Sequence, residues 1–227
     1  MNEKSKAWTG ANLGLPERFV RHHPSELMLR ALFSKRYCSL APDIGRSTRV
    51  LDVGAMYLNN LVPFHDRGCQ CYGVEVNEDM VAISRQAAAD QNLDVTMQAG
   101  TNRDLPFPDK MFDILLSLNV IHYEDDAAGL IAAMKEYKRA LAPGGRAFIV
   151  SAGPLHHLRA SATREGANRY RIAAEDDFRK GQVMAYFEDE TDLKAMADSV
   201  FRDVATGRVT ETHDKAQVDF LYAVCVR

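Results

Sequence analysis

The feature that most constrains the fold of this chain is the alternation of short apolar runs with helical segments. Five apolar runs have the length of strands: 49–55, 71–76, 95–99, 112–118 and 146–151. Three stretches that separate them carry apolar residues at helical spacing: 59–66, 78–91 and 125–142. Strands that alternate with helices form a parallel sheet covered on both faces, and ligands bind at the carboxyl ends of its strands. We therefore expect an α/β protein with its site at that edge.

The two ends of the chain depart from this alternation. Two strand-like runs, 204–211 and 218–226, are joined by a short polar connection, which predicts an antiparallel hairpin. The predicted organisation of the single domain has four parts: an N-terminal helical cap at 1–48, a cofactor-binding core at 49–152, a substrate lid at 153–190, and a C-terminal helix and hairpin at 191–227.

Composition narrows the classes of partner. The formal net charge of −3 arises from 28 basic and 31 acidic residues scattered along the chain, so no basic face predicts binding to nucleic acid or to a membrane surface. No run of eighteen apolar residues and no signal-peptide core is present, which predicts a cytoplasmic protein. The four cysteines are too sparse and irregular for a disulfide framework or a zinc site, and no metal is expected. The sequence leaves the oligomeric state open.

Four motifs follow one another in a characteristic order: Val50-Leu-Asp-Val-Gly54, the acidic strand end Glu75, Leu105-Pro-Phe107 ahead of Phe112-Asp113, and Leu141-Ala-Pro-Gly-Gly145. Together they resemble class I S-adenosylmethionine-dependent methyltransferases, in particular the small-molecule, methyltransferase type 11-like branch. The resemblance covers residues 49–151. It implies a Rossmann-like fold in which a seven-stranded, mostly parallel sheet ends in an antiparallel strand, in agreement with the predicted hairpin.

The resemblance implies S-adenosylmethionine as the cofactor and gives roles to the first two strand ends. Asp52, Gly54 and Ala55 are implied to lie beside the amino acid part of the cofactor, and the alternative is that they only form a tight bend. Glu75 is implied to accept hydrogen bonds from both ribose hydroxyls. The alternative for Glu75 is an exposed surface carboxylate.

Later strand ends are implied to complete the site. Thr101 and Asn102 would border the adenine, Val76 would supply an apolar wall beside it, and Asn119 would lie at the edge of the cofactor. His122 and Tyr123 are the candidate catalytic residues facing the acceptor. Their alternative role is to satisfy the start of the following helix.

One departure from the family pattern concerns the first turn, where Met56 and Leu58 stand at positions that are usually glycine. We expect a reshaped turn. The predicted function is methyl transfer to a small molecule, with O-methylation preferred because His122 has a pKa suited to removing a hydroxyl proton at neutral pH. The alternatives are a noncatalytic binding or partner protein of the same fold, suggested by Met56 and Leu58, and a nicotinamide-dependent oxidoreductase.

Overall fold

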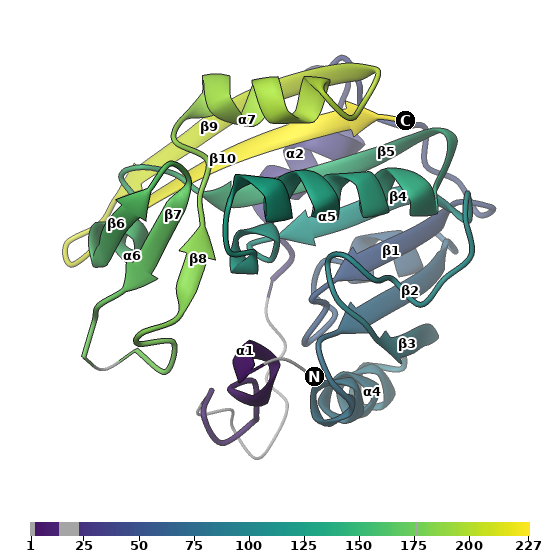
Figure 1. The fold of residues 1–227 in the computed structure, drawn as a ribbon. Helices are drawn as coiled ribbons and strands as arrows, with labels where there is room; N and C mark the ends of the chain where they lie inside the picture. The colour runs from purple at the N-terminus through teal and green to yellow at the C-terminus, as the bar shows by residue number, and fades with distance from the viewer. Residues whose placement is uncertain (1–2, 14–22, 176) are drawn as a thin grey trace.

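A seven-stranded sheet forms the centre of the computed structural model, which describes residues 3–13, 23–175 and 177–227 (Figure 1). Its order is β3-β2-β1-β4-β5-β10-β9. The strands are β1 (Arg49–Val53), β2 (Gln70–Glu75), β3 (Val95–Ala99), β4 (Phe112–Leu118), β5 (Leu141–Ala152), β9 (Asp203–Thr212) and β10 (Gln217–Val226). The first five run parallel, whereas β10 pairs antiparallel with both β5 and β9. The predicted fold class and the terminal hairpin are confirmed.

Helices cover both faces of this sheet because side chains alternate along each strand. Val50 of β1 packs with α2 (Glu26–Phe33), α3 (Val62–His65) and α4 (Glu78–Gln91) on one face. Leu51 packs with α5 (Ala127–Ala140) and α7 (Glu190–Asp198) on the other. No helix within the described ranges has the length and apolar character needed to cross a membrane.

The start of α4 fixes the edge of the sheet where the site lies. Asn77 caps this helix by accepting a hydrogen bond from the backbone N–H of Met80 at 2.9 Å. Because Asn77 comes two residues after the last residue of β2, the chain turns there from strand into helix. The side chain at the end of β2 therefore lies beside a helix N-terminus.

The end of α5 differs from the prediction. The helix was expected to span residues 125–142, but it begins at Ala127 and ends at Ala140, and β5 already begins at Leu141. Pairing with β4 shifts register between Phe112 and Ile114, so the segment Pro143-Gly-Gly145 forms an irregularity inside the strand. Gly144 adopts φ +76° there, which a glycine allows without strain.

Segment 153–190 contains a second, small sheet that the sequence did not reveal. The segment comprises α6 (His157–Ala160), β6 (Ala162–Gly166), β7 (Arg169–Ile172) and β8 (Val183–Ala185). The three strands pair antiparallel and form the sheet. Glu188 anchors it, since its carboxylate lies 2.8 Å from the Arg159 guanidinium and accepts a hydrogen bond from the Tyr170 hydroxyl. The role of this segment as a lid stays a prediction. In the cap, α1 (Glu3–Lys6) and α2 are described, and residues 14–22 lie outside the described ranges.

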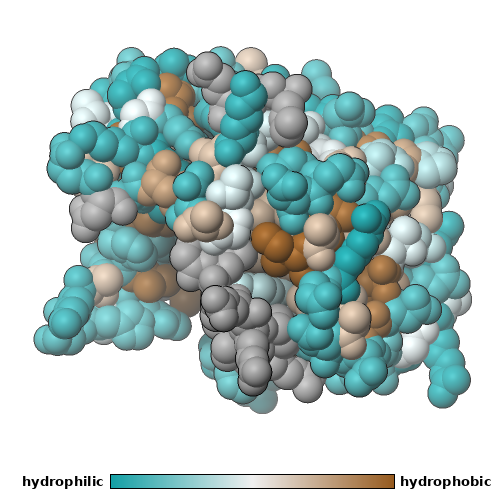
Figure 2. Space-filling view, turned by 90° about the horizontal axis from the view of Figure 1, so that it is seen from below, coloured by the Kyte–Doolittle hydropathy of each residue, from teal (hydrophilic) through white to brown (hydrophobic). Residues whose placement is uncertain are grey.

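The face seen from below in Figure 2 is mostly hydrophilic, with apolar side chains in small separate patches. Such a mixture is the ordinary character of a surface in contact with water.

Candidate functional site

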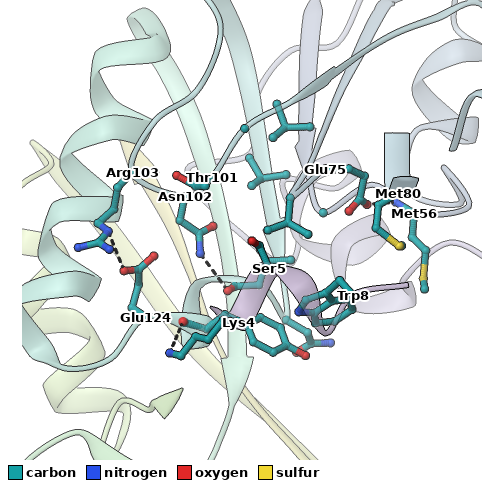
Figure 3. A pocket seen from close by; sticks show the side chains of 18 of the residues that line it. Lys4, Ser5, Trp8, Met56, Glu75, Met80, Thr101, Asn102, Arg103 and Glu124 are labelled. Carbon is teal, nitrogen blue, oxygen red and sulfur yellow. Dashed lines mark hydrogen bonds and ion pairs between the residues drawn. The ribbon is translucent and has the colours of Figure 1, made fainter. Parts of the chain in front are cut away.

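A cavity of about 290 Å³ lies at the carboxyl ends of the parallel strands, at the lower end of the range for small-ligand sites (Figure 3). Core residues line it after each of four strands: Gly54 and Met56 after β1, Glu75, Val76 and Met80 at and after β2, Gly100 to Arg103 after β3, and Asn119, Val120 and Tyr123 to Asp125 after β4. Lys4, Ser5 and Trp8 from the N-terminal segment complete the lining.

The turn after β1 keeps a glycine-like backbone although two of its residues are not glycine. Gly54 has φ +73°, and a Cβ placed on it would lie 2.5 Å from Val120 Cγ2. Met56 and Leu58 have φ +42° and +64°, in the left-handed region that favours glycine. Leu58 is fully buried in the core away from the cavity, whereas Met56 lines the cavity. Both residues therefore take backbone angles that favour glycine, and Met56 adds one thioether to the site.

Glu75 is a buried carboxylate that lines the cavity, with 5% of its surface exposed; another, Glu124, is paired with Arg103. Oε1 of Glu75 accepts a hydrogen bond from the backbone N–H of Met56 at 2.6 Å. Burial raises its pKa to about 7, partly opposed by the backbone N–H groups of Met56 and Val76. Among the described residues no cation lies within ion-pair distance of it. The alternative of an exposed surface Glu is wrong.

Asp52 and Ala55 lie behind the cavity and do not line it. Asp52 is 1% exposed in the middle of the sheet, and burial together with the nearby Glu75 raises its pKa well above the usual range. Its Oδ2 has no hydrogen-bond partner among the described residues. Ala55 is also buried, and its N–H approaches the carbonyl oxygen of Val74 at 3.4 Å. Two buried carboxylates thus lie close together beneath the first turn.

The other predicted cofactor residues all line the cavity, namely Val76, Thr101, Asn102 and Asn119. The Asn102 side chain is held by the protein itself, because its Nδ2 donates to the carbonyl oxygen of Val120 at 3.1 Å and its Oδ1 accepts from the Tyr137 hydroxyl at 2.6 Å. Thr101 is exposed at the rim. Asn119 turns with φ +59° directly after β4.

The two candidate catalytic residues are neighbours in the turn η1 (Ile121–Tyr123), and their ring centroids lie 5.0 Å apart. Tyr123 lines the cavity, and its hydroxyl accepts a hydrogen bond from Arg179 at 3.1 Å. His122 does not line it. The imidazole of His122 is 1% exposed, packs against the ring of Tyr186 at 5.3 Å, and lies 3.4 Å from Ser151 Oγ. Burial lowers its pKa to about 3, so it is neutral at physiological pH, and it lies behind Tyr123 rather than at the cavity wall.

Several lining residues carried no sequence signal for the site: Lys4, Trp8, Arg103, Glu124 and Asp125. They include two ion pairs, Lys4 with Asp125 at 2.5 Å and Arg103 with Glu124 at 3.0 Å. Figure 3 shows Arg103 and Glu124 paired across from Glu75, with Lys4 and Trp8 below. Because these pairs are neutral overall, Glu75 gives the cavity an excess of negative charge. The described part of the chain holds no group of three or more His, Cys, Asp or Glu residues placed to bind a metal ion.

Comparison with known proteins identifies the family of the segment that surrounds the cavity. The sequence model of the family described as "Methyltransferase domain" matches residues 51–149, which include every strand end around the cavity. Residues 51–149 belong to the methyltransferase domain family. The resemblance seen in the four sequence motifs is confirmed, and the family implies S-adenosylmethionine as the cofactor. The nicotinamide-dependent oxidoreductase considered from the sequence is not retained.

Two individual relatives of this domain are also named as methyltransferases. The chain is 33% identical over 103 residues to an uncharacterized methyltransferase, YcgJ, of Bacillus subtilis, which covers 45% of this chain and 40% of that protein. It is 33% identical over 84 residues to ajmaline N-methyltransferase of Rauvolfia serpentina, covering 36% and 28%. The chain thus spans less than half the length of these relatives, and the likeness concerns the core.

Solved structures extend the likeness in fold beyond that core. A SAM-dependent methyltransferase from Methanosarcina mazei superposes with a TM-score of 0.64 at 15% identity, covering 80% of this chain and 93% of that one. The crystal structure of YcgJ gives a TM-score of 0.57 at 17% identity, covering 82% and 94%. At these identities the comparison shows the fold alone.

Proposed function

We propose that this chain transfers the methyl group of S-adenosylmethionine to a small-molecule acceptor. The observation that carries the proposal is Glu75, a buried carboxylate without a cation, which faces a cavity at the strand ends of a methyltransferase domain. A buried carboxylate is costly unless donors or a positive charge compensate it. A ligand with vicinal hydroxyls and a sulfonium cation supplies both.

The remaining residues of the cavity fit the other parts of this cofactor. Backbone at Gly54 and Met56 permits close approach of the amino acid part, since Gly54 carries no Cβ where one would meet Val120. Val76 and Met80 form apolar walls for a flat base, and Thr101 offers a hydroxyl at its edge.

The cofactor supplies an activated methyl group, so the protein mainly positions the acceptor and excludes water. Asn119 and Tyr123 lie at the end of the cavity that follows β4, and we assign the acceptor to that end. Oxygen acceptors are preferred, because Glu124 lines the cavity with a pKa that burial raises and is suited to take up a hydroxyl proton. In this role Glu124 replaces His122, which is buried and does not line the cavity.

A small molecule is the favoured acceptor class for two reasons. Basic and acidic residues are scattered along the chain, with a formal net charge of −3, which disfavours nucleic acid. Relatives named for small-molecule acceptors include ajmaline N-methyltransferase and a probable tocopherol O-methyltransferase, although another is named a probable tRNA methyltransferase.

Titration calorimetry with S-adenosylmethionine and S-adenosylhomocysteine tests the proposal. Wild-type protein should bind both, and Glu75→Gln should weaken binding, whereas Glu78→Gln, an exposed residue at the start of α4, should not. Folded protein that binds neither compound would refute the proposal. Binding without methylation of any compound in an acceptor screen would instead identify the noncatalytic binding protein suggested by Met56.

A further inference from the structure

Residues 3–8 cross the cavity and are fastened to both of its rims. On one rim, Asn77 Nδ2 donates to the carbonyl oxygens of Ser5 and Trp8, at 2.8 and 3.1 Å. On the other, Lys4 Nζ donates to the carbonyl oxygen of Tyr123 at 2.9 Å and pairs with Asp125. Asn77 follows the strand of Glu75, and Tyr123 follows β4, so the segment joins the proposed cofactor side to the proposed acceptor side.

Trp8 is the largest side chain that this segment brings to the cavity. Its indole packs edge to face on Tyr123, with ring centroids 4.9 Å apart, and both residues line the cavity. It also packs edge to face on Phe178, 5.4 Å away in segment 153–190. Figure 3 shows Trp8 below and to the left of Met56 and Met80.

The fastening of this segment is weak enough to be reversible. Helix α1 has four residues, and a helix of that length does not hold together without tertiary contacts. The Lys4 and Asp125 side chains are 21% and 55% exposed, and ion pairs of such exposure contribute little stability. The position of Trp8 therefore depends on a few contacts at the rims of the cavity.

We propose that residues 3–8 are a closing segment of the binding site, in which Trp8 contacts the bound ligand while Lys4 and Asn77 hold the segment over it. The inference rests on the proposed function for the identity of the ligand. It adds Trp8, which lies outside the matched domain of 51–149, to the binding residues and makes release of residues 3–8 a step in ligand exchange.

Trp8 is the only tryptophan of the chain, so its fluorescence reports this contact directly. Saturation with S-adenosylhomocysteine should change its emission, and stopped-flow mixing should follow binding in time. By calorimetry, Trp8→Ala should bind S-adenosylhomocysteine about tenfold more weakly than wild type, and Trp8→Phe should retain most of the affinity. Thermal melts of both variants check that they fold.

Lys4→Met tests the fastening, with Lys6→Met as its matched control, because Lys6 is an exposed lysine of the same helix. Lys4→Met should raise both the association and the dissociation rate constants of S-adenosylhomocysteine by about threefold, since the segment then opens more often. Lys6→Met should leave both rates unchanged.

Two results separate the inference from the proposed function. If calorimetry shows no binding of S-adenosylhomocysteine to folded wild-type protein, the proposed function and the closing segment fail together. If wild type binds, but Trp8 emission does not respond and Trp8→Ala binds as tightly, the closing segment alone is overturned. Equal rates for the Lys4→Met and Lys6→Met variants would overturn the role of Lys4 in holding it.

Discussion

The backbone N–H of Met56 donates a hydrogen bond to Oε1 of Glu75 across 2.6 Å, which ties the first turn to the end of the neighbouring strand. The turn reaches this position with a left-handed residue, since Met56 has φ +42°. A main-chain donor therefore orients the carboxylate, and no cation among the described residues neutralises it. The carboxylate of Glu75 is thus positioned to accept hydrogen bonds from a ligand.

The titration of Glu75 should control ligand affinity near neutral pH. Its pKa is about 7 in the folded chain, against 4.5 for an ordinary Glu. Ligand hydroxyls donate to the ionised form, so the affinity for S-adenosylhomocysteine should rise by up to about tenfold per pH unit below pH 7 and level off above it. Glu75→Gln should bind more weakly by about 2 kcal/mol and should lose this pH dependence. Calorimetry between pH 5.5 and 8.5 measures both effects.

The ionisation of Glu75 should have the opposite effect on the stability of the folded protein, which should fall as pH rises. Between pH 4.5 and 7 the folded chain holds a proton that the unfolded chain has lost, so this group makes stability fall as pH rises through that window. Urea unfolding of the ligand-free protein should show that slope in wild type and in Glu78→Gln, and less of it in Glu75→Gln. Identical pH profiles for all three proteins would contradict the burial of this charge.

At position 56 a glycine should give a more stable protein than an alanine, which reverses the usual order of stability for these two residues. A residue other than glycine at positive φ is strained, whereas glycine is not. We expect Met56→Gly to be more stable than Met56→Ala by about 1 kcal/mol in urea unfolding. Ala82→Gly on the exposed face of α4 is the control and should cost about 1 kcal/mol. Equal stability of the two Met56 variants would show that the turn relaxes.

Gly54 should tolerate a methyl group less well than Gly144, although the two have nearly the same φ, +73° and +76°. A Cβ on Gly144 would meet no atom within 4 Å, whereas one on Gly54 would lie 2.5 Å from Val120 Cγ2. Gly54→Ala should therefore cost about 2 kcal/mol more than Gly144→Ala in urea unfolding. Combining Gly54→Ala with Val120→Ala should cost less than the sum of the two, and strict additivity would argue against the clash.

The main sheet could be predicted from the sequence because parallel strands buried on both faces are continuous apolar runs. The small sheet could not, since β6 carries a single partly buried apolar residue, Ala162, and β7 alternates its two buried apolar residues, Tyr170 and Ile172, with arginines. Charged residues at such positions are typical of a loop, so the pattern did not predict strands there.

The cofactor side of the site was predictable for a related reason. Gly54, Glu75, Thr101 and Asn119 lie at or directly after strand ends, and strand ends of a parallel sheet meet at one edge. Trp8 reaches the same edge only through the tertiary fold, so local sequence carries no sign of it. His122 and Tyr123 are neighbours with adjacent rings, and the sequence motif does not show that Tyr123 lines the cavity while His122 is buried behind it.

His122 should act on stability rather than on catalysis. Burial lowers its pKa to about 3 from an ordinary 6.5, so the unfolded chain binds a proton between these values that the folded chain excludes. The stability it contributes is present above pH 6.5 and is lost as pH falls toward 3, by up to about 1.4 kcal/mol per pH unit. His122→Gln should therefore unfold with a shallower acid dependence than wild type, while the exposed His213→Gln should match wild type.

In a methylation assay, the pH–rate profile of His122→Gln between pH 6 and 9 should keep the wild-type shape, because a base must reach the acceptor and His122 does not line the cavity. Loss of the acidic limb, in which the rate rises with pH, in that variant would restore His122 as the general base.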